Sequence, residues 1–207
     1  MQKPIRPVGS SGFTLMELMV TLALGAVILG VAIPNLTTFI QNNRLSGIAN
    51  DLLRSFQMAR TEAIKSQQNV VICASANPTV ANPTCSYGSF SSGWIVFNDT
   101  NSNWQSDGVA SEAVLERHGA VDPTVAARYD FNAIESYGQT GFANPAGAKT
   151  PTRTIALCDK RGNQALGLNS TARAIFVSAT GRVRVSQLKT DTDTAFAVAG
   201  LNGACPP

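Results

Sequence analysis

The sequence predicts an α+β protein in which a long N-terminal helix, membrane-spanning in its first half, packs on an antiparallel β-sheet domain. Residues 13–33 form an apolar run whose only charged residue is Glu17. Over residues 35–68 the helical period continues, but charged residues are interleaved with the apolar ones. Beyond residue 69 the apolar period shortens to that of strands, which indicates a β-rich domain over residues 69–207.

The apolar run is long enough to cross a membrane. Its 21 residues, 13–33, would span about 31 Å as a helix, close to the thickness of a bilayer's hydrocarbon core. The residues before it contain Lys3 and Arg6 and no acid, a charge bias that keeps a segment in the cytoplasm. We therefore expect a single-pass inner-membrane protein with its C-terminal domain in the periplasm.

Glu17 is the unusual feature of this run. A charged side chain inside a bilayer is costly, so it is retained mostly where it meets an opposite charge. We expect that partner to be an amine of a neighbouring copy. The alternative is an ordinary signal anchor with an incidental glutamate. A secretory signal, however, places small residues after its apolar core, whereas Gly12 stands before the run.

The residues Gly12-Phe13-Thr14-Leu15-Met16-Glu17, followed by the apolar run and Pro34, resemble the class III signal of type IV pilins and type II secretion pseudopilins. The resemblance implies that residues 1–12 are a leader and that a prepilin peptidase cleaves between Gly12 and Phe13. Methylation of Phe13 would follow, leaving 195 residues (207 − 12). It also implies that Glu17 neutralises the terminal amine of an adjacent subunit during assembly, and that the fold is type IV pilin-like.

The second half of the helix is predicted over residues 35–68, after a membrane-spanning half at 13–34. Its apolar residues recur at three- and four-residue spacing and are expected to pack on the sheet: Ile48, Leu52, Phe56, Ala59 and Ala63. Pro34 predicts a bend where the helix leaves the membrane. Gln67-Gln68-Asn69 marks its end.

Strands are predicted over residues 70–73, 93–97, 113–115, 127–131, 154–158, 174–177 and 182–185. Loops rich in Asn, Pro, Gly and Ser separate them. The hydrophobic fraction of 44% and the charged fraction of 14% fit one globular domain attached to a membrane span, and they exclude a disordered tail.

Four cysteines indicate an oxidising compartment, either the periplasm or the cell surface. Three pairings are possible. We favour Cys73 with Cys85, which closes a loop of Asn-Pro turns, and Cys158 with Cys205, which fixes the C-terminus. A metal site is the competing interpretation, but there is no C-x-x-C pair and His118 is the only histidine, so we expect no metal.

The chain also resembles the FimT/GspH-like minor pilins over nearly its whole length. The order of its segments carries this resemblance: a strand running into Cys73, then Cys85, Gly93 to Asp99 with Asn101, Glu112 and Leu115, Leu157-Cys158, and Gly181-Arg182-Val183-Arg184-Val185.

Two other constellations suggest chemistry but have a simpler interpretation. Residues 99–103 alternate oxygen ligands as a calcium-binding loop begins, but Trp104 stands where such loops need glycine and Ala110 occupies the twelfth position. We interpret this segment as a turn built by local Asn and Asp hydrogen bonds. His118 lies at a strand end without an activated nucleophile nearby, so we interpret it as an exposed histidine and expect no catalytic residues, no enzyme activity and no cofactor.

Charge is unevenly distributed along the domain. Residues 66–148 carry two basic and seven acidic side chains, whereas residues 149–207 carry eight basic and three acidic ones, so the two segments have net charges of −5 and +5. A basic C-terminal third on an exported domain is typical of a surface that meets a polyanion, and double-stranded DNA is the leading candidate.

Arg182 and Arg184 are two residues apart on a predicted strand, so both project from one face while Val183 and Val185 point to the other. In FimT-like proteins of naturally competent bacteria a matching Gly-Arg-x-Arg segment contributes to DNA uptake. The resemblance therefore implies a DNA-binding role for Gly181, Arg182 and Arg184. Lys189, one strand repeat farther along, is expected to contribute less. The alternative is an edge strand whose charges discourage aggregation.

These observations together predict a minor pilin of a type IV pilus. It would assemble with other pilins into a filament at the cell surface and bind extracellular DNA for natural transformation. The alternative is a GspH-like minor pseudopilin of a type II secretion system, which has a structural role in protein secretion.

Overall fold

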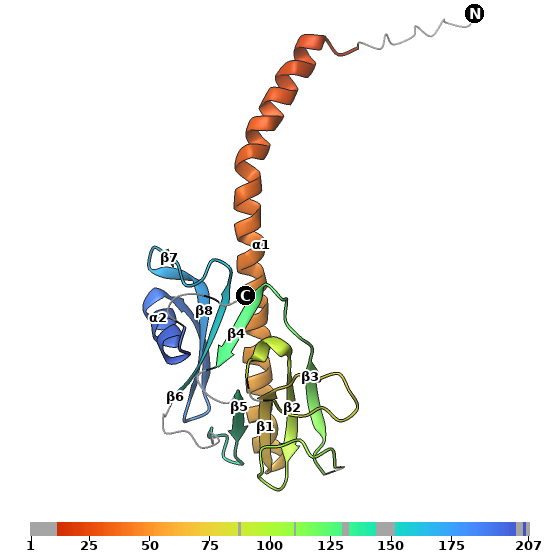
Figure 1. The fold of residues 1–207 in the computed structure, drawn as a ribbon, viewed down its shortest axis with the longest axis vertical. Helices are drawn as coiled ribbons and strands as arrows, with labels where there is room; N and C mark the ends of the chain where they lie inside the picture. Colours follow the sequence, from red (N-terminus) through yellow and green to blue (C-terminus); the bar gives the residue numbers. More distant parts are fainter. Residues whose placement is uncertain are drawn as a thin grey trace, which may run out of the picture. The chain divides into compact units, whose positions relative to one another are not determined.

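The computed structural model describes residues 12–86, 88–109, 111–129, 133–143, 152–201 and 205. Figure 1 shows one long helix, two β-sheets and a short second helix. The elements in chain order are α1 (Leu15–Ser66), β1 (Asn69–Ala74), η1 (Phe90–Ser92), β2 (Trp94–Asp99), β3 (Val114–His118), β4 (Val125–Tyr129), β5 (Ile134–Tyr137), β6 (Thr152–Asp159), β7 (Ala165–Leu166), β8 (Asn169–Ser178), β9 (Val183–Leu188) and α2 (Lys189–Val198).

The long helix α1 begins just after the glycine of the sequence motif. The hydroxyl of Thr14 accepts a hydrogen bond from the backbone N–H of Glu17, 3.2 Å, and so caps the first turn. The helix continues without interruption through Pro34 to Ser66. Gln67 then adopts a left-handed conformation with φ of 55°, which ends the helix where the sequence predicted.

The chain divides into two compact units, residues 1–41 and residues 42–207. In the first unit, the described side chains of α1 up to residue 40 are almost all exposed. By length and composition, this N-terminal part makes α1 the one helix in the described part of the chain that could cross a membrane. The second unit holds the folded domain together with the C-terminal half of α1.

The domain contains two antiparallel sheets rather than the single sheet expected. The first has the strand order β3-β2-β1-β5, and the second has the order β4-β6-β8-β7, with β9 also pairing with β8. The sequence pattern could not distinguish these arrangements because it reports which residues alternate and not which strands pair. It also missed β5, β7, η1 and α2.

The predicted apolar stripe of the helix forms the centre of the core. Ile48, Leu52, Phe56, Ala59 and Ala63 are all buried, as expected. They pack in one cluster with alternate residues of both sheets, such as Val70, Ile72, Trp94, Ile155 and Ile175. The amphipathic period therefore predicted the packing of this helix segment correctly.

Each sheet has an outer face that points away from the core around α1, and different segments cover these two outer faces. Helix α2 places Ala195 and Phe196 on the outer face of β6 and β8 (Figure 1). On the first sheet, Trp104 and Cys85 pack against the outer face of β1 and β2. Strands β6 and β8 are therefore buried on both faces along most of their length, although about half of their residues are polar and each strand includes a buried arginine.

An ion pair inside the protein joins the two sheets. The guanidinium Nε of Arg153 in β6 lies 3.7 Å from the Glu135 carboxylate in β5, and both side chains are buried. The hydroxyl of Tyr129 donates a hydrogen bond to the same carboxylate, 2.7 Å. One of the eight basic residues of the C-terminal third is therefore internal.

Some sequence predictions fall on residues that the structure does not describe. They are the leader residues 1–11, the last two residues of the strand expected at 127–131, Ala110, and Lys149.

Candidate functional site

The turn between β8 and β9 positions the two predicted arginines. The backbone N–H of Gly181 donates to the carbonyl oxygen of Ser178, 2.8 Å, and closes a four-residue turn. Gly181 has a φ of 75°, and a Cβ atom there would lie 2.1 Å from the carbonyl oxygen of Gly141. Gly181 is buried, so the structure gives it a role in shaping the turn rather than a place on the surface.

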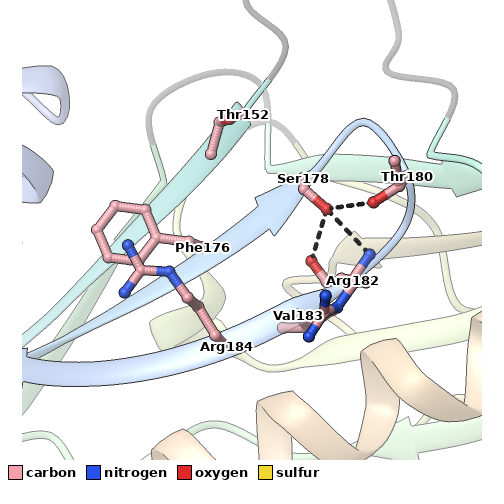
Figure 2. Close-up of a pocket in the computed structure, with 7 residues that line it drawn as sticks. All are labelled: Thr152, Phe176, Ser178, Thr180, Arg182, Val183 and Arg184. Carbon is pink, nitrogen blue, oxygen red and sulfur yellow. Dashed lines mark hydrogen bonds between the residues drawn. The ribbon is translucent and has the colours of Figure 1, made fainter.

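The hydroxyl of Ser178 holds the end of this turn that leads into β9. It accepts a hydrogen bond from the backbone N–H of Arg182, 3.1 Å, and lies 2.9 Å from the hydroxyl of Thr180 (Figure 2). The backbone of Arg182 is therefore held at the start of β9 while its side chain remains exposed.

The predicted alternation along β9 is present. Val183 and Val185 pack against the main core, and Arg182 and Arg184 are exposed. In Figure 2 the Arg184 side chain extends over the ring of Phe176 in the neighbouring strand β8. The two arginines border an open pocket of about 490 Å³, lined by Thr152, Phe176, Ser178, Thr180, Arg182, Val183 and Arg184.

Arg184 is engaged within the protein. Its Nη1 donates to Oδ2 of Asp191 in α2, 2.8 Å, and its Cζ lies 4.1 Å from the centre of the Phe176 ring. The hydrogen bond from Arg184 also lowers the pKa of the Asp191 carboxyl, so this acid is charged throughout the neutral range. Arg184 would have to share or exchange this partner in order to bind another anion.

Arg182 is the less constrained of the two cations. Its side chain is exposed, and no carboxylate among the described residues lies within ion-pair distance of it. Sequence reasoning identified both arginines but missed Phe176 and Asp191, which only tertiary structure brings to them.

Lys189 does not extend the arginine strand. The structure places it at the first position of α2, where its ammonium pairs with Asp193 one turn further along the helix. It does not line the pocket. Strand β9 ends at Leu188, so the expectation that Lys189 lies farther along the same strand is wrong.

Most of the basic C-terminal third is not a single surface. Arg173 is buried, donates to backbone carbonyls of Ser170 and Ala172, and has a pKa lowered by that burial. Arg161 is held by Asp159 and by the amide oxygen of Asn42. The net charge of +5 therefore overstates the exposed positive charge, because sequence composition does not show which cations are internal.

The two other constellations resolve into local structure. Asp99 accepts backbone N–H groups of Asn103 and Trp104, at 3.2 and 3.1 Å, which is the Asn/Asp turn expected. His118 is half-buried rather than exposed. Its ring stacks on Trp94 with centres 3.7 Å apart, and its Nδ1 lies 2.7 Å from the Gly119 carbonyl oxygen.

The structure pairs the cysteines as the sequence favoured. Cys73 is bonded to Cys85, and Cys158 to Cys205. The first bond holds the loop after β1 to the outer face of the first sheet, and the second holds residue 205 beside α2 and β6.

Glu17 lies in the first turn of α1, and its side chain is exposed. Among the described residues no basic side chain forms an ion pair with it. The structure of a single chain is thus compatible with a partner supplied by another subunit.

Comparisons with known proteins match both parts of the chain. The sequence model described as Type II transport protein GspH matches residues 49–181. The prokaryotic N-terminal methylation motif matches residues 9–33. No protein with a curated description matches significantly.

Two crystal structures of one protein resemble this chain. The crystal structure of the type IV minor pilin FimU of Pseudomonas aeruginosa in space group P21 has a TM-score of 0.50 and 21% identity, and the match covers 72% of this chain and 92% of that chain. FimU in space group P65 gives a TM-score of 0.47 and 20% identity, with 69% and 92% covered. Since the GspH model spans more than half of the sequence, this chain belongs to the GspH family and is a type IV pilin-like minor pilin or pseudopilin.

Proposed function

We propose that this protein is a minor pilin of a type IV pilus that contributes to filament assembly and binds extracellular DNA without sequence preference. The observation that carries the DNA-binding part is the open pocket between the β8–β9 turn and the outer face of β8, where Arg182 and Arg184 both face solvent. The pilin part rests on the family match and on the motif at the start of α1.

The pocket has the chemistry of a phosphate site. Guanidinium groups bind phosphate oxygens through paired N–H donors, and the hydroxyls of Ser178, Thr180 and Thr152 offer further hydrogen bonds. Phosphate contacts position a nucleic acid without reading its sequence. Duplexes of unrelated sequence should therefore bind with similar, modest affinity.

The DNA interaction is testable by titration of the full chain, solubilised in detergent, with fluorescent duplexes at two or more salt concentrations. With about three phosphates neutralised, the slope of log K against log salt should be about −2.7. Arg182→Gln with Arg184→Gln should reduce the magnitude of that slope by nearly 2 and weaken binding to all sequences alike.

A matched control is Lys160→Gln, which removes an exposed positive charge outside the pocket. It should change binding much less than the double arginine variant. Equal binding by wild type and the double variant would place the site elsewhere. Absence of binding by the wild type at low salt would leave only the structural pilin role.

The N-terminal processing is part of the same proposal. A prepilin peptidase would cleave between Gly12 and Phe13 and methylate Phe13, and Glu17 would neutralise the new amine of an adjacent subunit in the filament. The apolar segment and the methylation motif support this assignment. Before assembly, the protein would lie in the inner membrane with residues 69–207 in the periplasm.

The second candidate is a minor pseudopilin of a type II secretion system, favoured by the description of the matching family model. Deletion of the gene separates the two functions. Loss of twitching or DNA uptake with normal secretion supports the pilus. Loss of exoprotein secretion with normal twitching supports the pseudopilin.

A further inference from the structure

The loop that joins β2 to β3 collects oxygen atoms that have no hydrogen-bond donor. Its described residues are 100–109 and 111–113. Glu112 is only 3% exposed, and its Oε1 has no hydrogen-bond partner. Ser106, 8% exposed, has an equally unpartnered hydroxyl, and so does the buried Oδ1 of Asn98 at the end of β2. A buried carboxylate oxygen without a donor or a cation is costly, so the Glu112 carboxylate calls for a ligand.

The Glu112 carboxylate is directed into the loop. Its other oxygen, Oε2, accepts the backbone N–H of Asp107, 3.0 Å. The Asp107 carboxylate in turn receives the side-chain amides of Asn101 and Asn103 at one oxygen, at 2.9 and 2.8 Å. Hydrogen bonds thus connect the side chains of Asn101 and Asn103 to that of Asp107, and the Glu112 carboxylate to the backbone of Asp107.

We propose that this loop binds Ca²⁺ through side-chain oxygens of Asp99, Asn101, Asn103, Asp107 and Glu112. All five side chains offer oxygen and none offers nitrogen or sulfur as a metal ligand, which is the donor set that calcium prefers. The ligands recur at positions one, three, five and nine of the loop, as in calcium loops of the helix-loop-helix type, with the last carboxylate two residues later than usual.

The objection raised by the sequence does not hold in the structure. Trp104 stands at the sixth position, where such loops use glycine because the backbone takes a positive φ. Trp104 has a φ of 60° and donates its N–H to the first ligand, Asp99, 3.1 Å. The backbone therefore adopts the conformation that the motif needs without glycine.

Within the described residues, no three carboxylate, histidine or cysteine side chains are already grouped as a metal centre. We therefore expect the ligands of the proposed site to come together only when the cation binds. Ca²⁺ would take the place of the two amide donors on Asp107, and the unpartnered oxygen of Glu112 would supply a second charged ligand. Sites of this kind bind weakly, so we expect a dissociation constant of about 10⁻⁴ to 10⁻³ M.

The test uses the full chain in detergent, with CaCl₂, MgCl₂ and TbCl₃ as probes. Ca²⁺ should raise the unfolding temperature relative to EGTA and should do so more than Mg²⁺, because binding to the folded state alone stabilises it. Tb³⁺ bound in the loop should show luminescence sensitised by Trp104. Trp104→Phe should remove that emission while Trp94, in the core, remains.

Asp107→Asn changes an exposed side chain and is not expected to unfold the protein, whereas Glu112→Gln removes the buried ligand. Each should weaken the Ca²⁺ response at least about tenfold. Asp193→Asn, which removes the same charge from α2, should leave the response unchanged. A wild type that shows no Ca²⁺-dependent change, or an Asp107→Asn variant that responds as the wild type does, would overturn the proposal.

Discussion

At the scale of single residues, the two arginines of β9 differ in their availability although they share a face. Arg184 is paired with Asp191 and lies over Phe176, while Arg182 has no carboxylate partner among the described residues. The alternation of Val and Arg predicted the face correctly because side chains in a strand alternate with a period of two. It could not predict Asp191, which reaches Arg184 only because α2 folds back on the sheet.

Asp191→Asn should increase the affinity for DNA, because it releases Arg184 from its internal partner. Exposed ion pairs contribute up to about 1 kcal/mol, so the gain should not exceed about fivefold. Asp193→Asn, on the same helix, removes an equal negative charge. It therefore controls for the general effect of lower negative charge on DNA affinity. A gain of equal size in both variants, or a gain that persists when Arg184 is also replaced by Gln, would contradict this role of the pair.

The same pair predicts a pH dependence of stability. The pKa of Asp191 in the folded state lies below the ordinary value of 3.8, mainly because Arg184 donates a hydrogen bond to it. Its stabilising contribution is therefore complete above pH 3.8 and is lost as the pH falls through the lower folded-state value. The difference in unfolding free energy between wild type and Asp191→Asn should be constant from neutral pH down to that region and should narrow below it. If the difference in unfolding free energy instead changes between pH 6 and 8, the titration of another group must cause it.

Glu17→Ala should insert into the membrane as well as the wild type or better, because it removes the only charge from the apolar run. Incorporation into sheared filaments should fall, because the terminal amine of the neighbouring subunit would lose its partner. Immunoblots of membrane and filament fractions measure both. Glu17→Asp retains the charge and serves as the control, with an intermediate loss expected. Normal incorporation of the alanine variant would remove the pairing hypothesis.

At the scale of elements, the sequence predicted the helix and the buried strands better than the short or amphipathic elements. The stripe through Leu52 and Phe56 has a clear period of 3.6 residues and was found directly. Strand β5, whose four residues Ile134–Tyr137 are all buried, includes Glu135 and Ser136 and so lacks an apolar signature. Helix α2 begins with six polar residues and has only two apolar residues in the core, so the apolar period did not predict it.

The bond between Cys158 and Cys205 should be the main restraint on the C-terminal segment after α2. It closes a loop of 47 residues, for which the chain-entropy model gives about 4 kcal/mol. Cys158→Ala with Cys205→Ala should therefore speed hydrogen exchange in α2 much more than in β1 and β2. The pair Cys73→Ala with Cys85→Ala should show the opposite pattern. Equal protection of α2 with and without the bond would show that packing of Phe196 alone holds the helix.

At the scale of the whole molecule, the chain combines an apolar N-terminal helix segment with a disulfide-bonded domain. The sequence of the first part indicates the protein family, whereas the charge of the second part was used to predict a binding surface. The N-terminal motif indicated the family from sequence alone, and the match of residues 9–33 to the methylation motif agrees with it, while cleavage after Gly12 stays a prediction. The net charge of the domain was a weaker guide. Arg153 and Arg173 account for part of the positive excess and are buried, so the surface that we propose for DNA binding is confined to the pocket around Arg182.

The most direct test of the central claim, that this protein is a processed filament subunit, is mass spectrometry of the protein recovered from sheared filaments. We predict a chain of 195 residues (207 − 12) that begins with N-methylated Phe13, with both disulfides intact. Recovery only from membranes, or a filament-bound chain that begins at any other residue, would contradict it.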